Sequence, residues 1–413
     1  MSGLQDSVWA GDIQQLEGLV SERALSGETI VLNMGPQHPS THGVLRLMLE
    51  LDGEMVVNCV PDIGYLHTGI EKNMEAKQYE KAITMTDRMD YLNPLGNNLV
   101  YCLAIEKIIG LDVPPRAQYL RVLLAELTRI NSHLVWLGTH ALDIGAMSMF
   151  LYCFREREKI LDIFEMVSGQ RMMSTYFRPG GLWRDVPEEF EPAVRDFISY
   201  FPARVDDYER LLTDNPLWLD RTQGIGFLSA QDAVALGCTG PTLRGSGVNW
   251  DIRKAIPYSS YEHFEFDVPL GQHGDVYDRY LIRVEEMRQS LRIVQQAMAK
   301  LPGGPVRSNN RKYVPPPRSE LGTSMEAVIH HFKLWTEGFR PPEGEVYVRV
   351  ESPRGELGCY LISDGSPKPW RVHFRTPSFV HLSALPHMAK GYLIADLVAI
   401  IGTIDIVLGD ADR

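Results

Sequence analysis

The sequence is short of cysteine, with five in 413 residues, and no two of them form a Cys-x-x-Cys pair. That pair is the usual spacing for iron–sulfur and zinc sites, and an odd number of distant thiols does not make a disulfide framework. We therefore expect five structural thiols in a reducing compartment, with no metal held by this chain alone. The cysteines are Cys59, Cys102, Cys153, Cys238 and Cys359.

Nucleotide-binding and hydrolase motifs are also missing. The sequence has no Gly-x-x-x-x-Gly-Lys-Ser/Thr phosphate loop, no Gly-x-Gly-x-x-Gly turn, no Gly-x-Ser-x-Gly elbow and no His-Glu-x-x-His pair. It lacks a basic cluster too, and its formal charge of −12 disfavours nucleic acid and anionic lipid as partners. The densest charge run, Arg155 to Lys159, alternates in sign and predicts a solvated helix face.

Long hydrophobic runs are scarce. The most apolar window, Gly391 to Leu408, is interrupted by Asp396 and Asp405, which predicts a buried soluble segment because a carboxylate in hydrocarbon is costly. The acidic start of the sequence resembles neither a signal peptide nor a transit peptide. We therefore expect any membrane attachment to come through partner proteins.

The patterns that are present predict an α+β fold. Alternating leucines between Leu45 and Leu51, then Asp52-Gly53 and an apolar run to Val60, predict a β-hairpin. Two leucine- and valine-rich stretches, around residues 120–137 and 284–298, have helical periodicity and predict a bundle of long helices.

Short strands bounded by glycine and proline return after the triple proline at 315–317, near residues 345–350, 358–362 and 370–374. The predicted architecture is a central long-helix bundle flanked by small N-terminal and C-terminal β-rich regions. We divide it into an N-terminal arm (1–27), a β-rich region (28–68), a helical core (69–312) and a C-terminal α/β region (313–413).

A loop rich in proline and glycine, residues 35–43, carries two histidines, His38 and His42. Its prolines and glycines fix the path of the backbone, and a histidine held there can donate a proton near neutral pH. The two histidines lack the helical spacing that would place them on one face to bind a metal, so a metal site is disfavoured. A purely structural loop is the other interpretation.

Two further residues are candidates for chemistry. Tyr91 follows a helical pattern and offers a phenol that can donate one hydrogen bond or proton in an apolar pocket. On burial tendency alone, a tyrosine at such a place is more often a packed core residue. Asp143 is the one carboxylate of the otherwise apolar stretch around it. If buried it needs a partner, either as a structural cap or within a polar network.

Taken together, the motifs resemble the D-subunit family of NADH:quinone oxidoreductase, respiratory complex I, from about residue 28 to residue 413. The matching stretches are GPQHPSTHG (35–43), YLHTGIEK (65–72), DRMDYL (87–92), EREK (156–159), RPGG (178–181), LRGSGVNWDIRK (243–254), SMEAVIHHFKLWTEG (324–338), RGELG (354–358), SDGS (363–366) and DADR (410–413).

This family is related to the large subunit of nickel–iron hydrogenases, so the resemblance implies a hydrogenase-like fold. Those hydrogenases hold their metals with four thiolates from two Cys-x-x-Cys pairs. The corresponding regions here, DRMDYL and the stretch that ends in DADR, contain no cysteine. Hydrogenase activity is therefore excluded by the absence of suitable soft ligands.

The resemblance implies that the former metal cavity accepts a quinone headgroup. His42 and Tyr91 would hydrogen-bond its two carbonyls, and Asp143 would pair with His42. Electrons would come from an iron–sulfur cluster in an adjacent subunit, and quinone would be the substrate. This chain itself would bind no metal, flavin or nucleotide. Loss of the His42 proton would signal to membrane-embedded pumping subunits.

The implied partners are other complex I subunits: the one that carries the terminal iron–sulfur cluster, a neighbouring peripheral-arm subunit and the membrane-arm subunit of the quinone channel. The implied location is peripheral, on the cytoplasmic face of a bacterial inner membrane. Two alternatives stay open: a ferredoxin-dependent, plastoquinone-reducing complex with a homologous subunit, and a purely structural scaffold. The sequence departs from many relatives at Thr68, where they have Arg, and at Met172-Met173, where several have a histidine.

Overall fold

Small antiparallel sheets and a thick layer of helices make up the computed structural model, which describes residues 28–41 and 43–413. The proposed arm at 1–27 and the candidate His42 lie outside the described residues. The first sheet joins β1 (Ile30–Met34), β2 (Arg46–Asp52) and β3 (Met55–Asp62) in that order. The predicted hairpin is thereby confirmed, and its turn uses Gly53 at a φ of 64°.

Helices dominate the middle of the chain. In order they are α3 (Ile70–Glu75), α4 (Tyr79–Thr86), α5 (Pro94–Ile109), α6 (Pro115–Asp143), α7 (Met147–Ser168), α8 (Phe190–Leu212), α9 (Pro216–Thr222), α10 (Ala230–Ala235), α11 (Gly240–Gly245), α12 (Ile252–Ala255) and α13 (Val276–Ala299). A two-stranded ribbon of β4 (Phe177–Arg178) and β5 (Gly181–Leu182) interrupts them.

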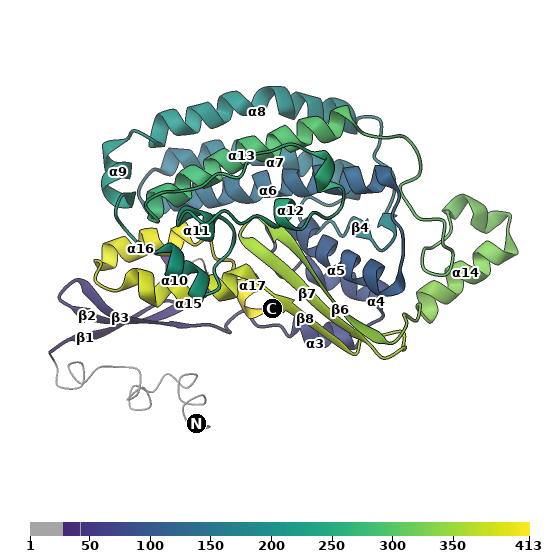
Figure 1. Ribbon diagram of the computed structural model, residues 1–413, viewed down its shortest axis with the longest axis horizontal. Coiled ribbons are helices and arrows are strands. Elements are labelled where there is room, and N and C mark those ends of the chain that lie inside the picture. The colour runs from purple at the N-terminus through teal and green to yellow at the C-terminus, as the bar shows by residue number, and fades with distance from the viewer. Residues whose placement is uncertain (1–27, 42) are drawn as a thin grey trace.

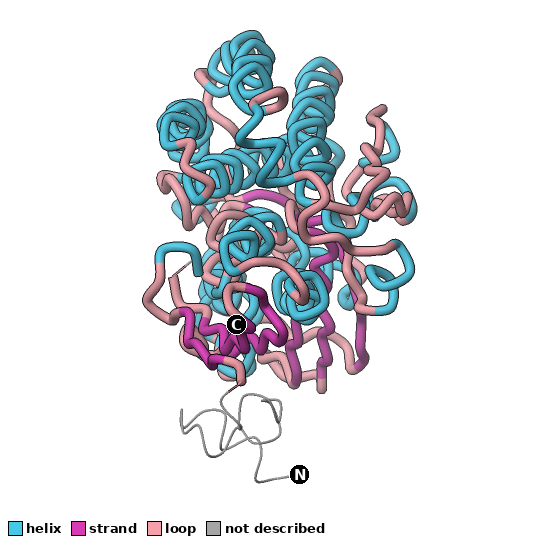
Figure 2. The backbone as a smooth tube through the Cα atoms, turned by 90° about the vertical axis from the view of Figure 1, so that its left-hand side faces the viewer, coloured by secondary structure: helices cyan, strands magenta, loops and turns pink. Residues whose placement is uncertain are grey.

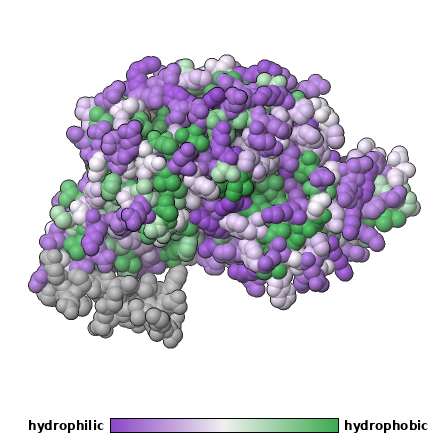
Figure 3. Space-filling model, viewed as in Figure 1, coloured by the Kyte–Doolittle hydropathy of each residue, from purple (hydrophilic) through white to green (hydrophobic). Residues whose placement is uncertain are grey.

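The long helices pack as the predicted bundle. α6 lies against both α7 and α13, and α8 covers these two from outside (Figure 1). Leu120, Leu127 and Leu134 on α6 are fully buried, as the leucine periodicity predicts. Seen end on, the long helices gather at one side of the molecule and the strands at the other (Figure 2). Hydrophilic residues dominate the outer face over α8 (Figure 3).

The charged run on α7 differs from its prediction. Glu156 is fully buried and Arg157 is 8% exposed, so these two residues do not form part of a solvated face. The Glu156 carboxylate accepts hydrogen bonds from Arg155 at 2.6 Å and from the Tyr200 hydroxyl at 2.9 Å. The physical reason is that α8 packs over this side of α7 and supplies Tyr200, a contact that the local charge pattern does not reveal.

The C-terminal part begins with α14 (Met325–Thr336), which follows the short turn η4 (Arg318–Gly322). A sheet of β6 (Gly344–Ser352), β7 (Gly355–Ser363) and β8 (Arg371–Arg375) comes next, as the short-strand pattern predicts. The chain then forms α15 (Pro377–Ala389), α16 (Ile394–Thr403) and α17 (Leu408–Asp412). These helices lie between the bundle and the first sheet (Figure 1).

The apolar window 391–408 forms α16 and its flanks. It is buried from Ala399 onward, as predicted, whereas Gly391, Leu393 and Ala395 at its start are exposed. Gly402 makes close packing against α6 possible, because a Cβ there would lie 2.6 Å from the His140 ring. Trp136 of α6 donates its indole N–H to the Gly402 carbonyl at 2.8 Å. Over residues 28–41 and 43–413, none of the helices combines the length and the apolar character needed to cross a membrane.

Candidate functional site

Tyr91 lies in the turn that joins α4 to α5. Asp90 folds this turn, because its carboxylate accepts the backbone N–H of Leu92 at 3.1 Å. Asn97 on α5 donates its amide to the carbonyls of Thr86 and Asp90, at 3.0 and 2.9 Å. Pro94 then starts α5 at a position where a missing N–H costs nothing. These bonds hold the backbone of Tyr91 in one place, and its side chain is half-buried.

A buried arginine links this turn to the C-terminal part of the chain. Arg354, in the β6–β7 turn, is 1% exposed and donates to the Asp90 carboxylate at 2.6 Å. The same guanidinium donates to the Asp405 carboxylate at 3.2 Å, to the Asp405 carbonyl at 2.7 Å and to the Ser132 hydroxyl at 3.2 Å. We call Asp90, Arg354 and Asp405 the arginine cluster. One cation thereby satisfies two buried carboxylates.

The arginine cluster sets the electrostatics around Tyr91. Burial raises the pKa of the Tyr91 phenol; the positive charge of Arg354 opposes this rise, while Asp90 and Asp405 add to it. Burial also raises the pKa of Asp90, despite the nearby Arg354. The phenol therefore stays protonated at neutral pH, in a form able to donate a hydrogen bond or a proton.

The last helix approaches the Tyr91 turn closely. A Cβ at Gly409 of α17 would lie 2.4 Å from the Met89 carbonyl oxygen, so only glycine fits there without a shift of the backbone. Asp410 is buried, accepts the Ser378 N–H at 3.1 Å, and has its pKa raised to about 7 by burial and by the charge of Asp90. The DRMDYL segment and the stretch ending in DADR thus meet in the interior.

Asp412 fastens the chain on the other side of α17. Its carboxylate accepts the backbone N–H groups of Gly64 and Leu66, at 2.9 and 2.7 Å, and its carbonyl lies 2.7 Å from His67 Nδ1. Arg413 donates to the Phe374 carbonyl at 2.8 Å. The YLHTG segment, the β8 end and α17 are therefore held together next to the site.

The histidine loop has the fixed path that its composition predicts. Gly35 has a φ of 88°, and a Cβ there would lie 2.1 Å from the Leu45 carbonyl oxygen. Thr41 is fully buried and donates its hydroxyl to the His38 carbonyl at 2.8 Å. Residues Pro39–Thr41 form the short helix η2, which directly precedes His42 in the sequence. The prediction for the His42 side chain itself stays a prediction.

Asp143 is the last residue of α6, and its side chain is half-buried. α6 ends at this residue, and a short turn leads to α7. Leu142 and Met147, on either side of the turn, are exposed, so this end of α6 is less covered by other elements than its middle. Burial still raises the pKa of Asp143 to about 6. Its carboxylate therefore titrates close to the range in which a histidine does.

α16 connects the segment that precedes His42, the helix that ends at Asp143 and the turn of Tyr91. η2, just before His42, packs against α16, and α16 packs against α6, which ends at Asp143. Asp405, which follows α16, binds Arg354 and through it the turn of Tyr91. The histidine loop, the end of α6 and the Tyr91 turn are thus arranged around one buried helix.

A further buried carboxylate, Asp87, was not singled out by its pattern. It is fully buried, accepts the amide of Asn98 at 2.5 Å and a hydrogen bond from the Thr175 hydroxyl, and burial raises its pKa to about 6. Thr175 belongs to the segment that follows Met172-Met173, so that segment packs beside the Tyr91 turn.

Sequence reasoning also gave no role to Arg354, Asp405 or Asp410. The sequence does contain one indication that such residues are buried and paired. Each is a charged residue within a short apolar or glycine-rich stretch, as at Asp405 after α16. That signal shows that a partner is needed but does not identify it, because Arg354 lies 264 positions from Asp90 and 51 positions from Asp405 in the chain.

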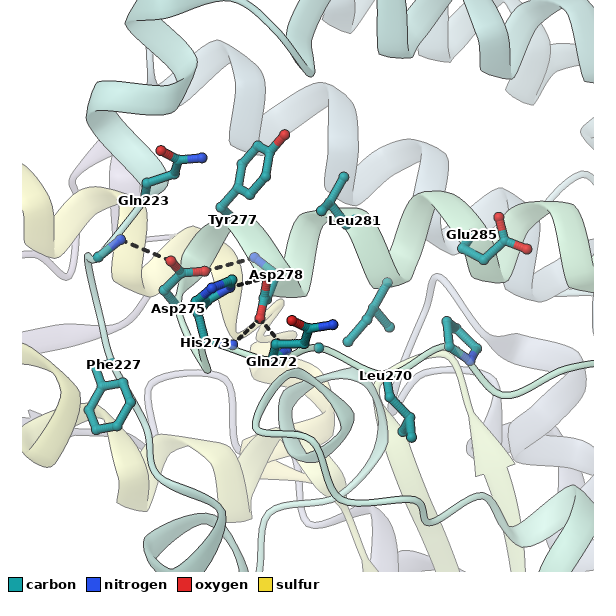
Figure 4. A pocket seen from close by; sticks show the side chains of 14 residues that line it. Gln223, Phe227, Leu270, Gln272, His273, Asp275, Tyr277, Asp278, Leu281 and Glu285 are labelled. Atoms are coloured by element: carbon teal, nitrogen blue, oxygen red, sulfur yellow. Dashed lines mark hydrogen bonds and ion pairs between the residues drawn. The ribbon is translucent and has the colours of Figure 1, made fainter.

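A surface cavity of about 880 Å³ lies elsewhere, beside the start of α13 (Figure 4). Its carboxylates are engaged in holding loops: Asp275 accepts the Gly224 N–H at 2.9 Å, and Asp278 accepts the Gln272 N–H at 2.6 Å and that of His273. Neither Tyr91 nor Asp143 is among its lining residues.

The five cysteines are all buried and unbridged, as predicted for structural thiols. Burial raises the pKa of the Cys238 thiol to about 11 and that of Cys59 to about 12, so neither ionises at neutral pH. Within the described part of the chain, no three His, Cys, Asp or Glu side chains are grouped as a metal site would require.

Comparison with known proteins identifies the family. Residues 143–413 match the family described as the 49 Kd subunit of respiratory-chain NADH dehydrogenase. Three bacterial proteins that are named as the D-subunit of NADH-quinone oxidoreductase match almost the whole chain. The one numbered 2 in Chloroflexus aurantiacus is 64% identical over 399 residues, which cover 95% of this chain and 97% of that protein.

The other two relatives agree with this match. The protein numbered 1 in Herpetosiphon aurantiacus is 64% identical over 389 residues, covering 94% of this chain and 92% of that protein. The protein of Geotalea uraniireducens is 58% identical over 388 residues, covering 94% and 100%. The sequence motifs, the α+β architecture and these matches agree, and the chain belongs to the D-subunit family of NADH-quinone oxidoreductase, whose members work with the other subunits of the complex I enzyme.

Proposed function

We propose that this chain forms, with a neighbouring iron–sulfur subunit, the cavity in which complex I reduces quinone to quinol. The observation that carries the proposal is the position of Tyr91: a rigid turn holds it beside the arginine cluster, where the DRMDYL and C-terminal segments meet. In this proposal that interior is a hydrogenase-type metal cavity that has lost its thiolate ligands, and a quinone headgroup occupies the space.

Quinone reduction consumes two electrons and two protons. The electrons come from the terminal iron–sulfur cluster of the adjacent subunit, because this chain has no Cys-x-x-Cys pair to hold one. Tyr91 donates one proton to one carbonyl oxygen of the quinone, and His42 donates the other at the opposite carbonyl. The positive charge of Arg354 favours the tyrosinate that remains, since it lowers the pKa of the phenol.

Asp143 acts on His42 in this proposal. A carboxylate near an imidazole favours the charged imidazolium, so the pair holds the proton until the quinone takes it. Loss of that proton leaves Asp143 without its cation. Because Asp143 ends the long helix α6, we propose that this change starts the signal to the proton-pumping membrane subunits.

The wider assembly follows from the same proposal. The partners are the terminal-cluster subunit, a neighbouring peripheral-arm subunit and the membrane-arm subunit of the quinone channel. The chain works as a peripheral protein on the cytoplasmic face of a bacterial inner membrane, and its regions are 1–27, 28–68, 69–312 and 313–413. The names of the relatives, which specify NADH and quinone, support NADH as the electron donor of the complex rather than ferredoxin.

The test uses Tyr91→Phe and His42→Ala in the assembled complex. We expect NADH oxidation by an artificial acceptor to continue while quinone reduction falls by about 100-fold, the usual contribution of a positioned proton donor. Tyr360→Phe, which removes a phenol from the outer sheet, is the matched control and should leave both activities unchanged. Normal quinone reduction in both variants would instead support a scaffold role for the chain.

A further inference from the structure

α14 is a helix with a fixed orientation at the edge of the molecule, where it projects from the body (Figure 1). The Ser324 hydroxyl accepts the Ala327 N–H at 3.3 Å and caps its first turn. Gln78 donates its side-chain amide to the Thr336 carbonyl at 2.8 Å at the other end. Phe339, just beyond the helix, stacks on Tyr79 with a centroid separation of 5.5 Å. The helix is therefore capped at its first turn and attached to the body of the protein at its C-terminal end.

The outward face of α14 is apolar. Met325, Val328, Ile329 and Phe332 recur at the i, i+3, i+4 and i+7 positions, which fall on one side of a helix. Their exposed fractions are 75%, 41%, 49% and 64%. We call these four residues the α14 stripe. Hydrophobic residues are visible along the outer edge of this projection (Figure 3).

The inward face of the same helix is already in use. Ala327 is buried, and Leu334 packs against the main hydrophobic core. The stripe thus lies on the side that points away from the core. Single exposed apolar residues, such as Leu217 on α9, are common on protein surfaces, but four in one helical register are the pattern of a helix that fits into a groove.

The charge around the stripe indicates the kind of partner. Residues 304–340 contain six Lys and Arg residues against three Glu, whereas the chain as a whole carries a formal charge of −12. Arg311 already pairs with Glu320 at 2.7 Å, but Lys333, at the edge of the stripe, is exposed. The segment that carries the stripe is therefore net basic within an acidic chain, which favours a partner surface with carboxylates at its rim.

A protein fits these features better than a lipid surface. A helix that lies on an anionic membrane carries several Lys or Arg on its polar face. α14 carries one lysine, Lys333, against Glu326, and its neighbouring basic residues lie on other segments. The chain belongs to a complex of several subunits, so partner proteins are present.

We propose that the α14 stripe docks into an apolar groove, bordered by Asp or Glu side chains, on another subunit of the same oxidoreductase. The stripe supplies the hydrophobic contact, and Lys333 with the flanking basic residues sets the orientation. This inference rests on the family membership of the chain and not on its proposed role in quinone reduction.

A photo-crosslinking amino acid placed at position 332 of the complete complex tests the proposal. We expect illumination of the purified complex to join this residue to one other subunit, at an apolar segment with a nearby carboxylate. A product with lipid, a product with a second copy of this chain, or no protein product would overturn the proposal. Phe227, which is 53% exposed and lies in the cavity of Figure 4, is the matched position and should not yield that product.

Glutamate substitutions in the α14 stripe test the same contact independently, through the amount of partner subunit that stays bound. Ile329→Glu combined with Phe332→Glu should reduce at least tenfold the amount of the crosslinked partner that stays bound in the purified complex. Lys333→Glu should weaken retention mainly at low salt, where charge attraction is strongest. Leu217→Glu adds a charge at a similarly exposed leucine and should leave retention unchanged. Full retention in the double variant would contradict the proposed contact.

Discussion

Arg354 donates a hydrogen bond to Asp90 at 2.6 Å across 264 positions of the sequence, and the same guanidinium binds Asp405. This one contact joins the turn of Tyr91 to the β6–β7 turn and to the end of α16. The side chains of Asp90, Arg354 and Asp405 are at most 4% exposed. If one of them were removed, water could not reach the others to take its place as a hydrogen-bond partner.

Arg354→Met should therefore destabilise the fold by about 3–5 kcal/mol, because it leaves two buried carboxylates without a cation. The expected result is a much smaller yield of assembled complex, measured by native electrophoresis. Adding Asp405→Asn to this variant should restore part of the yield, since one of the two uncompensated charges is then gone. If the single variant assembles normally, the arginine cluster does not stabilise the site.

The difference between local and distant information explains which features the sequence predicts. The hairpin at β2 and β3 and the buried face of α6 depend on spacing within a few residues, and both are confirmed. The burial of Glu156 depends on α8, whose Tyr200 lies 44 positions away, and the charge pattern of α7 gives the wrong expectation.

The same reasoning applies to the candidate site. Tyr91 could be proposed from its motif, but the arginine cluster around it could not, because Arg354 and Asp405 come from remote turns. Asp405 is visible in the sequence as a charge that interrupts an apolar run, and the residues around it are buried, as that pattern predicts. Its partner depends on how α16 packs, and no local pattern contains that information.

Asp410 should make stability depend on pH. Burial and the Asp90 charge raise its pKa to about 7, above the roughly 3.9 of an unfolded aspartate. The protonated form is favoured in the folded state, so its stabilising contribution is complete below about pH 4 and is lost as the pH rises through 7. Between pH 6 and 8 that loss is on the order of 1 kcal/mol.

Asp410→Asn removes this titration and should flatten the pH dependence over the same range. The measurement is the midpoint temperature for release of this chain from the purified complex, at pH 6 and pH 8, in both proteins. Asp364→Asn, at an exposed carboxylate in the outer loop before β8, should behave like the unmodified chain. If Asp410→Asn leaves the difference between the midpoint temperatures at pH 6 and pH 8 unchanged, Asp410 is not the group that makes stability depend on pH.

Gly409→Ala should disturb the site through the backbone. The added Cβ would lie 2.4 Å from the Met89 carbonyl oxygen, two residues before Tyr91, so α17 and the Tyr91 turn must move apart. We expect a stability loss of about 1–3 kcal/mol, as for other overpacked interiors, and lower quinone reduction with NADH oxidation retained.

Gly303→Ala is the matched change, because a Cβ at Gly303 meets nothing within 4 Å and its φ is not positive. It should affect neither stability nor activity. Equal behaviour of the two alanine variants would mean that the contact between α17 and the Tyr91 turn is unimportant for quinone reduction.

The midpoint potential of the terminal iron–sulfur cluster should change little with pH between 7 and 8.5. Met172 and Met173 occupy the stretch in which the family resemblance implies a histidine for several relatives, and a methionine side chain does not titrate. Asp87, which binds Thr175 in the same region, has a pKa raised to about 6 and is therefore largely ionised throughout that range. Met173→His should add a group that exchanges a proton on reduction, and the slope should then approach roughly 59 mV per pH unit. A redox titration of the unmodified complex that already shows such a slope would mean that another group near the cluster takes up the proton.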